Sequence, residues 1–119
     1  MNEFHYTIAE TDLASRQAGA RARGFIEERC LAGERVIVYL GAVLSVSESF
    51  ADELFGVLVA RHGLEWFAEH VGLRDASPTS LRAIIEAIRS RLQSQFPGNP
   101  DIALLTAKKA LDARRHSRA

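Results

Sequence analysis

The stretch Val36–Ala60, VIVYLGAVLSVSESFADELFGVLVA, contains the two features that decide the fold. Its first five residues, Val36–Leu40, form an unbroken apolar run rich in β-branched side chains. Continuous rather than alternating hydrophobicity is typical of a strand that is covered on both faces, as in parallel sheets. We therefore predict a central strand at Val36–Leu40.

The second half of the stretch, from Ser45 onward, predicts a buried helix. Ser49 is the best candidate for its N-cap, because Asp52 follows three residues later, as in a capping box. Asp52 and Glu53 would lie in the first turn, where the helix dipole favours negative charge. The residues from Leu54 to Ala60 leave almost no polar face, which indicates that most of this helix is buried.

Further elements are predicted on both sides of this stretch from hydrophobic periodicity and capping residues. In chain order they are a strand from Glu3 to Ala9, a helix from Leu13 to about Cys30 preceded by the polar caps Glu10, Thr11 and Asp12, a short helix from Leu64 to about His70 that follows Gly63, a strand from Val71 to Arg74, a helix that begins with the Ser77 cap and Pro78, and a last helix from about Pro100 to Ala113.

This order of strands and helices predicts a small α/β domain. Its sheet would be mostly parallel, with three to four strands, and would be packed by helices. We assign residues 1–97 to this domain and residues 98–119 to an extra C-terminal helix and a basic tail.

Composition narrows the class of protein. The chain has 119 residues, 15 of them basic and 15 acidic, which suits one soluble domain with a single core. The segment from Lys108 to Ala119 holds five Lys or Arg residues and one Asp, which gives it a charge of +4. Cys30 is the only cysteine, so an internal disulfide is excluded and a reducing compartment is favoured. Since neither a secretory signal nor a membrane-spanning run is visible, we expect a cytoplasmic protein.

Patterns typical of enzymes are weak. The four histidines and Cys30 lack the spacing of a metal site, and no glycine-rich phosphate loop occurs. The carboxylate pairs Glu27-Glu28 and Asp52-Glu53 fit solvated helix faces and first-turn dipole effects. We therefore expect no catalytic activity, no metal and no cofactor.

The segment Ser49–Gly56, SFADELFG, resembles the motif of the STAS-like family, a group of small bacterial proteins of unknown function. Members of that family carry a hydrophobic strand, a Ser-Ser-Phe-Ala-Asp-Glu turn and a helix with Leu-Phe-Gly. Gly63, Phe67, Leu73 and Ser77 fall where the family places a glycine, an aromatic residue, a strand leucine and a helix cap. The resemblance runs from about Leu13 to Leu92 and implies a STAS-like fold.

More remotely, the region resembles the anti-sigma-factor-antagonist domain, in which a serine kinase with a histidine-kinase-like ATPase fold phosphorylates a serine at the strand-to-helix turn. Ser47-Glu48-Ser49 aligns with that turn. The resemblance therefore implies that Ser49, with Ser47 and Glu48 beside it, is the candidate for phosphorylation or partner contact. The interaction surface would also include Phe50, Asp52, Glu53 and Ser77.

The chain departs from this wider group at three positions. Glu48 replaces the first serine of the pair, and Phe50 replaces the glycine of the antagonist turn. Tyr39 stands where the family often has an acidic residue. These differences bear on phosphorylation more than on the fold.

The resemblance thus implies a bacterial regulatory protein-binding module with a kinase of the ATPase type as its partner. One alternative is a non-switching assembly subunit, for example a homodimer that uses the apolar helix surface. Another is nucleic-acid binding through the basic C-terminus, which is less expected because the tail lacks aromatic residues for stacking on bases. Arg16, Arg21 and Arg23 fit the solvated face of a helix.

Overall fold

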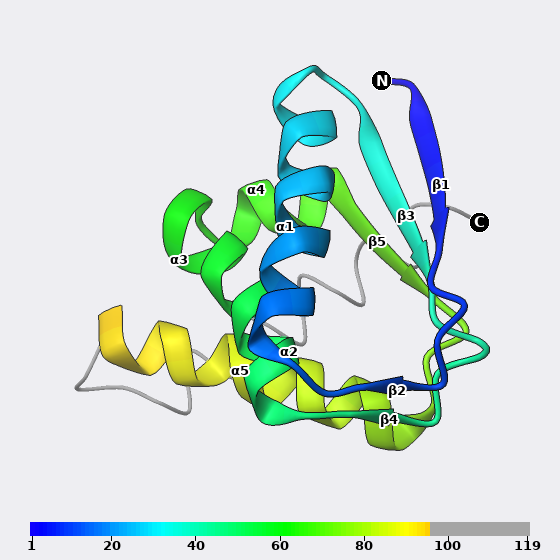
Figure 1. Ribbon diagram of the computed structural model, residues 1–119. Coiled ribbons are helices and arrows are strands. Elements are labelled where there is room, and N and C mark those ends of the chain that lie inside the picture. Colours follow the sequence, from blue (N-terminus) through cyan, green and yellow to red (C-terminus); the bar gives the residue numbers. More distant parts are fainter. Residues whose placement is uncertain (96–119) are drawn as a thin grey trace.

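Three parallel strands form the main sheet of the protein, whose computed structural model describes residues 1–95. They are β1 (Glu3–Thr7), β3 (Arg35–Tyr39) and β5 (Val71–Arg74), in the order β1-β3-β5 (Figure 1). Phe4 lies opposite Val36, and Val36 lies opposite Val71. The predicted strand at Val36–Leu40 is therefore confirmed as the central one.

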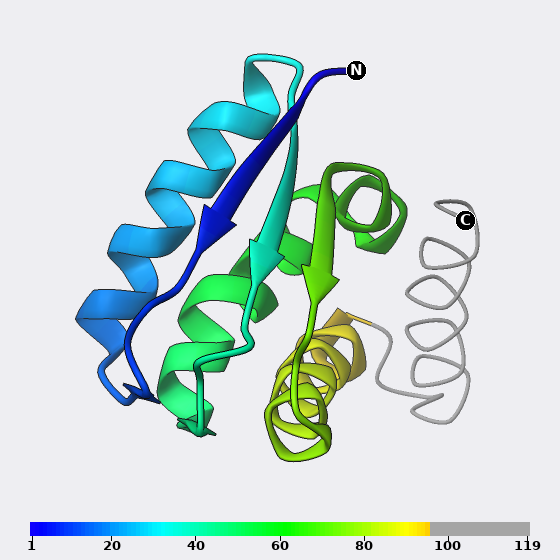
Figure 2. The same cartoon turned by 90° about the vertical axis from the view of Figure 1, so that its right-hand side faces the viewer.

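The helices cover one face of this sheet (Figures 1 and 2). They are α1 (Arg16–Leu31), α2 (Glu48–Ala51), α3 (Val57–His62), α4 (Leu64–His70) and α5 (Pro78–Gln95), with a π-helical turn, η1 (Asp52–Gly56), between α2 and α3. The predicted small α/β fold with a parallel sheet packed by helices is confirmed.

The core fills the space between the sheet and the helices. Val36 and Val38 point from β3 into this space, and neither side chain is exposed to solvent. The rings of Phe55 and Phe67 meet edge to face there, with centroids 6.2 Å apart. Ile37 points to the opposite face of the sheet and is also fully buried.

The start of the first helix differs from the prediction. Ser15 caps α1, because its Oγ accepts a hydrogen bond from the backbone N–H of Ala18 at 3.0 Å. Asp12 and Leu13 form a short strand, β2 (Asp12–Leu13), which pairs in parallel with β4 (Ser45–Val46). The polar residues before Leu13 therefore do not cap the helix, and burial of Leu13 holds this segment against the turn that precedes α2.

The C-terminal predictions fall on residues that the structure does not describe. The extra helix from about Pro100 to Ala113 lies beyond residue 95, as do the basic tail and the domain boundary at residue 97. Among residues 1–95, no helix is long and apolar enough to cross a membrane.

Candidate functional site

The turn from β4 into α2 is capped by Ser47. The Ser47 Oγ accepts a hydrogen bond from the backbone N–H of Phe50 at 3.1 Å and donates one to the carbonyl oxygen of Ala14 at 2.6 Å. The prediction that Ser49 is the N-cap is therefore wrong. The pairing of β2 with β4 brings the Ala14 carbonyl close to the earlier serine, and this contact could not be read from the local sequence.

Ser49 lies in the first turn of α2 instead. Within residues 1–95 its hydroxyl makes no hydrogen bond, and its side chain is half-buried. Ser45, by contrast, donates a hydrogen bond from Oγ to Asp12 Oδ1 at 2.7 Å. Of the three serines in this turn, Ser49 is thus the one whose hydroxyl is not used by the described part of the fold.

The neighbours of Ser49 have different environments. Glu48 is exposed and forms no ion pair within the described residues. Phe50 is only 2% exposed and packs in the core, so its side chain does not lie on the surface where we expected it. The surface of this turn is therefore built by Ser45, Glu48 and Ser49, and not by the aromatic ring.

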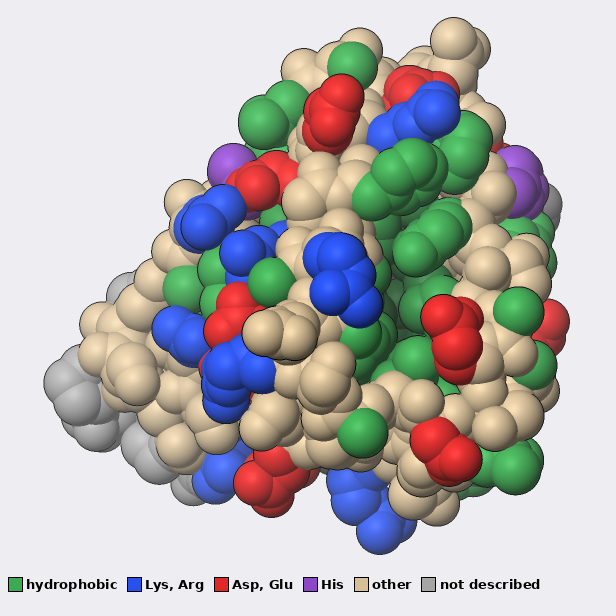
Figure 3. Space-filling view, viewed as in Figure 1, with side chains coloured by type: hydrophobic (Ala, Val, Ile, Leu, Met, Phe, Trp, Pro, Cys, Tyr) green, Lys and Arg blue, Asp and Glu red, His purple; other side chains and the backbone are tan. Residues whose placement is uncertain are grey.

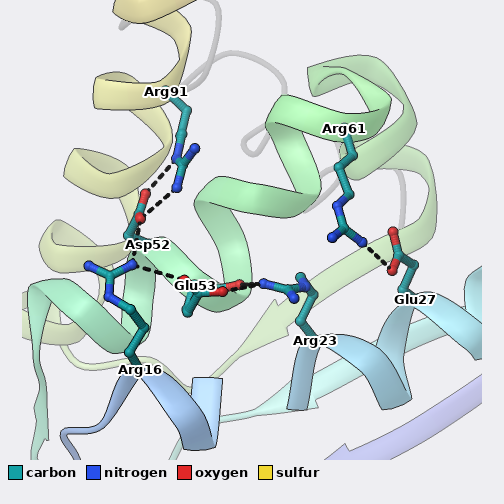
Figure 4. A network of polar contacts seen from close by, with 7 residues as sticks. All are labelled: Arg16, Arg23, Glu27, Asp52, Glu53, Arg61 and Arg91. Atoms are coloured by element: carbon teal, nitrogen blue, oxygen red, sulfur yellow. Dashed lines mark hydrogen bonds and ion pairs between the residues drawn. The ribbon is translucent and has the colours of Figure 1, made fainter. Parts of the chain in front are cut away.

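Asp52 and Glu53 belong to a cluster of ion pairs that joins three helical segments (Figure 4). Both carboxylate oxygens of Asp52 accept hydrogen bonds from Arg91 on α5 at 2.7 Å, and Arg16 on α1 reaches Asp52 at 3.1 Å. Arg16 also reaches Glu53 at 2.9 Å. Arg23 donates both to the Glu53 carboxylate and, at 2.7 Å, to the Glu53 carbonyl oxygen.

The arginines keep this acidic pair charged. Hydrogen bonds from Arg91 and then Arg16 hold the pKa of Asp52 below its ordinary value. Hydrogen bonds from Arg23 and Arg16 lower the pKa of Glu53. Arg16, Arg23 and Arg91 form ion pairs with Asp52 and Glu53, and none of these pairs involves Glu48.

Two glycines allow the helices to approach this closely. A Cβ atom on Gly19 of α1 would lie 2.9 Å from the carbonyl oxygen of Phe50 and 3.0 Å from Cβ of Glu53. A Cβ atom on Gly56 would lie 2.7 Å from Asp52 Oδ1 and 3.1 Å from Cγ of Arg91. Gly19 and Gly56 therefore position α1 and α5 against η1, which carries the acidic pair.

The geometry accounts for most of the SFADELFG motif in physical terms. Phe50 fills the core, Asp52 and Glu53 bind arginines, and Gly56 makes room for α5. The π-helical turn lies at the same place, and such turns are frequent at functional sites. Ser49 is the polar residue of the motif whose side chain makes no hydrogen bond within the described structure.

Ser77 caps α5, as predicted. Its Oγ accepts a hydrogen bond from the backbone N–H of Ser80 at 3.1 Å, and its carbonyl oxygen accepts one from the N–H of Leu81 at 2.8 Å. No hydrogen bond joins Ser77 to the turn at residues 45–53 within the described chain. The structure therefore places Ser77 at a helix start and does not bring it into polar contact with Ser49.

The other reactive side chains have structural partners. Burial opposes ionisation of Glu27, but hydrogen bonds from His62 and Arg61 hold its pKa below the ordinary value. Burial raises the pKa of the Cys30 thiol to about 11, so this cysteine is a poor nucleophile at neutral pH. Over residues 1–95, no three His, Cys, Asp or Glu side chains come together as a metal site would require.

The arginine cluster is the part of the site that sequence reasoning missed. Arg16 and Arg23 were expected to be solvated, yet the Arg23 side chain is only 14% exposed. The available signal was the spacing of Arg16, Gly19 and Arg23, which places all three on one face of a helix. Only the fold shows that this face meets Asp52 and Glu53.

Comparison with known protein families identifies the family to which this chain belongs. A family model described as a STAS-like domain of unknown function matches residues 18–81, which is more than half of the chain. The chain therefore belongs to this family of STAS-like domains. Comparisons with curated proteins and with solved structures each found no match.

Proposed function

We propose that this STAS-like domain is a bacterial regulatory protein-binding module and not an enzyme. Its working surface would be the turn from Ser45 to Glu53, and Ser49 would be the residue that is phosphorylated. The partner would be a serine kinase of the histidine-kinase-like ATPase type, as the resemblance to anti-sigma-factor antagonists suggests. No cofactor is needed for this role, and cytoplasmic localisation would suit it.

The observation that carries the proposal is the difference between the serines of the turn. Ser45 and Ser47 use their hydroxyls to join β2 and β4 and to cap α2. The Ser49 hydroxyl makes no hydrogen bond with any described residue and is partly accessible. A kinase could therefore modify Ser49 without first breaking a hydrogen bond of the fold.

The arginine cluster supplies a physical basis for a switch. Ser49 and Glu53 are four residues apart on a continuous helical segment, so they lie on the same face. A phosphate on Ser49 would add about −1.5 to −2 charge units one turn from Glu53, which pairs with Arg16, whose side chain is 54% exposed. It would compete with Asp52 and Glu53 for this guanidinium and thereby alter the contact between α1 and α2.

The alternative function, an assembly subunit, would need the apolar side chains of the helix that follows the turn to lie on the surface, and they do not. Leu54, Phe55, Leu58 and Val59 are at most 1% exposed, because they pack against the sheet and the neighbouring helices. These side chains are not accessible to a second copy in the folded protein. The protein-binding turn is therefore the function that the geometry supports best.

Phosphate-affinity electrophoresis of the protein purified from its host tests the proposal. We expect a shifted species that disappears in Ser49→Ala and persists in Ser90→Ala, a matched change of an exposed serine on α5. Growth conditions should be varied, since the kinase would act in response to a signal. Absence of a shifted species under all of them, or its persistence in Ser49→Ala, would contradict phosphorylation at this position.

A further inference from the structure

The strand β1 lies at an edge of the sheet. The backbone N–H of Arg35 donates to Asn2 O at 2.7 Å and the N–H of Ile8 donates to Tyr39 O at 3.1 Å, so the even-numbered residues of this segment pair with β3. In a parallel ladder the alternate residues direct their backbone groups the other way. The N–H and C=O groups of His5 and Thr7 therefore point outward from the sheet, and both residues are exposed.

Aromatic side chains line a hollow between this edge and α1. Phe25 on α1 is 39% exposed, and its ring centroid lies 5.5 Å from that of Phe4 and 5.2 Å from that of Tyr6. The space-filling view shows hydrophobic side chains along this hollow between α1 and β1 (Figure 3). No strand of residues 1–95 pairs with the outer side of β1, and a strand edge left in this way beside accessible aromatic rings is an arrangement that most soluble domains avoid.

The hollow is charged differently on its two sides. Arg29 stacks on Phe4, with its guanidinium carbon 3.8 Å from the ring centroid, and it is paired with Glu34. Arg21 lies one helical turn before Phe25 on the same side of α1, is exposed, and forms no ion pair within residues 1–95. Figure 3 shows acidic side chains on the β1 and β2 side of the hollow, and both basic and acidic side chains on the α1 side. Arg21 therefore offers a positive charge that no described residue pairs, one turn from the ring of Phe25.

We propose that the hollow between β1 and α1 binds an extended peptide segment of another protein, which adds to the sheet as a strand next to β1. Alternate residues of the segment would be apolar and pack on Phe4, Tyr6 and Phe25, and an acidic residue would pair with Arg21. Main-chain hydrogen bonds to His5 and Thr7 would supply affinity independent of sequence. This surface uses residues separate from the turn around Ser49.

The position of α1 favours a single strand over a second copy of the domain. In Figure 2, α1 lies beyond the outer edge of β1 and behind it. A second domain joined through its own β1 would bring its own α1 into the same space. One strand without a helix fits between the edge and α1.

Selection of a phage-displayed library of random peptides on the full-length protein tests this inference. We expect enriched peptides that alternate apolar and polar residues and contain an Asp or Glu. When resynthesised, they should slow amide hydrogen exchange at His5 and Thr7. Arg21→Glu should weaken their binding by about tenfold, while Arg82→Glu, a matched change of an exposed arginine on α5, should leave it unchanged.

Three outcomes would overturn the inference. One is the absence of enrichment above that on an unrelated protein. Another is binding that Arg21→Glu and Phe25→Ser leave unchanged. A third outcome is slower amide hydrogen exchange at residues 45–53 in place of β1, which would show that the peptides bind the turn.

Circular dichroism would verify that both variants are folded, and Arg21→Glu alters only a surface side chain.

Discussion

At the scale of single residues, Ser47 and Ser49 differ in whether the fold uses their hydroxyl groups. The Ser47 hydroxyl is both donor and acceptor, and it ties the start of α2 to the segment after β2. The Ser49 hydroxyl has no such partner within the described chain. The stabilising role of Ser47 and the proposed regulatory role of Ser49 can therefore be tested separately by changing one serine at a time.

Replacing the two serines by alanine should have different effects on stability. Ser47→Ala removes an N-cap and should lower the free energy of unfolding by about 1 kcal/mol. Ser49→Ala removes no hydrogen bond and should leave it within about 0.5 kcal/mol of the wild type. Urea denaturation followed by circular dichroism measures both. A larger loss in Ser49→Ala than in Ser47→Ala would show that the caps are assigned wrongly.

At the scale of elements, the contact of α1 with α2 and η1 depends on the absence of a side chain at Gly19. Gly19→Ala would place a methyl group against the Phe50 carbonyl oxygen and should cost about 1 to 3 kcal/mol. Gly24 lies on the same helix, and a Cβ atom there would meet nothing within 4 Å, so Gly24→Ala should stabilise the protein by about 1 kcal/mol. Thermal unfolding of the two variants checks the opposite signs. If the two substitutions change the stability equally, the backbone of Phe50 does not lie as close to Gly19 as the structure shows.

The ion pairs between the same elements predict a dependence of stability on pH. The pKa values of Asp52 and Glu53 are lower in the folded protein than their ordinary values of about 4. Their stabilising contribution is therefore present above those ordinary values and is lost as the pH falls through the lowered ones.

Urea midpoints measured between about pH 6 and pH 3 test this dependence. The midpoint of the wild type should fall toward low pH more steeply than that of Asp52→Asn, in which this carboxyl can no longer titrate. Part of the fall should remain in the variant, because the pKa of Glu27 is also lowered. If the urea midpoints of the two proteins change identically with pH, the ion pairs of Asp52 do not contribute to the pH dependence of stability.

Much of this arrangement of elements could be predicted from the sequence. The continuous apolar run at Val36–Leu40 and the Ser77-Pro78 helix start are signals that involve only neighbouring residues, and both predictions are confirmed. The short strand at Val71–Arg74 is also confirmed, with its bounds unchanged.

The parts that could not be predicted depend on contacts between distant residues. Ser47, and not Ser49, is the cap because its hydroxyl also donates a hydrogen bond to the carbonyl oxygen of Ala14, more than thirty residues earlier in the chain. Asp52 is held by Arg91, which lies 39 residues later. Burial of Phe50 likewise follows from packing that a resemblance to a surface turn did not indicate.

At the scale of the whole molecule, one continuous core joins the sheet to the helices, and Cys30 lies inside it at 2% exposure. Because burial raises the pKa of its thiol to about 11, Cys30 should not react with a thiol reagent at about pH 7.5 in the native state. Labelling with Ellman's reagent should follow unfolding as urea is increased. Rapid reaction of the native protein would contradict a closed core.

The central claim is that the hydroxyl group of Ser49 is the one in this turn that can be phosphorylated for regulation. Tandem mass spectrometry of the protein isolated from its host tests this most directly, because it assigns a phosphate to a single residue. The account predicts phosphate on Ser49 and none on Ser45 or Ser47, whose hydroxyls are hydrogen-bonded in the fold. Phosphate on Ser47, or a turn that is unmodified under every growth condition, would contradict it.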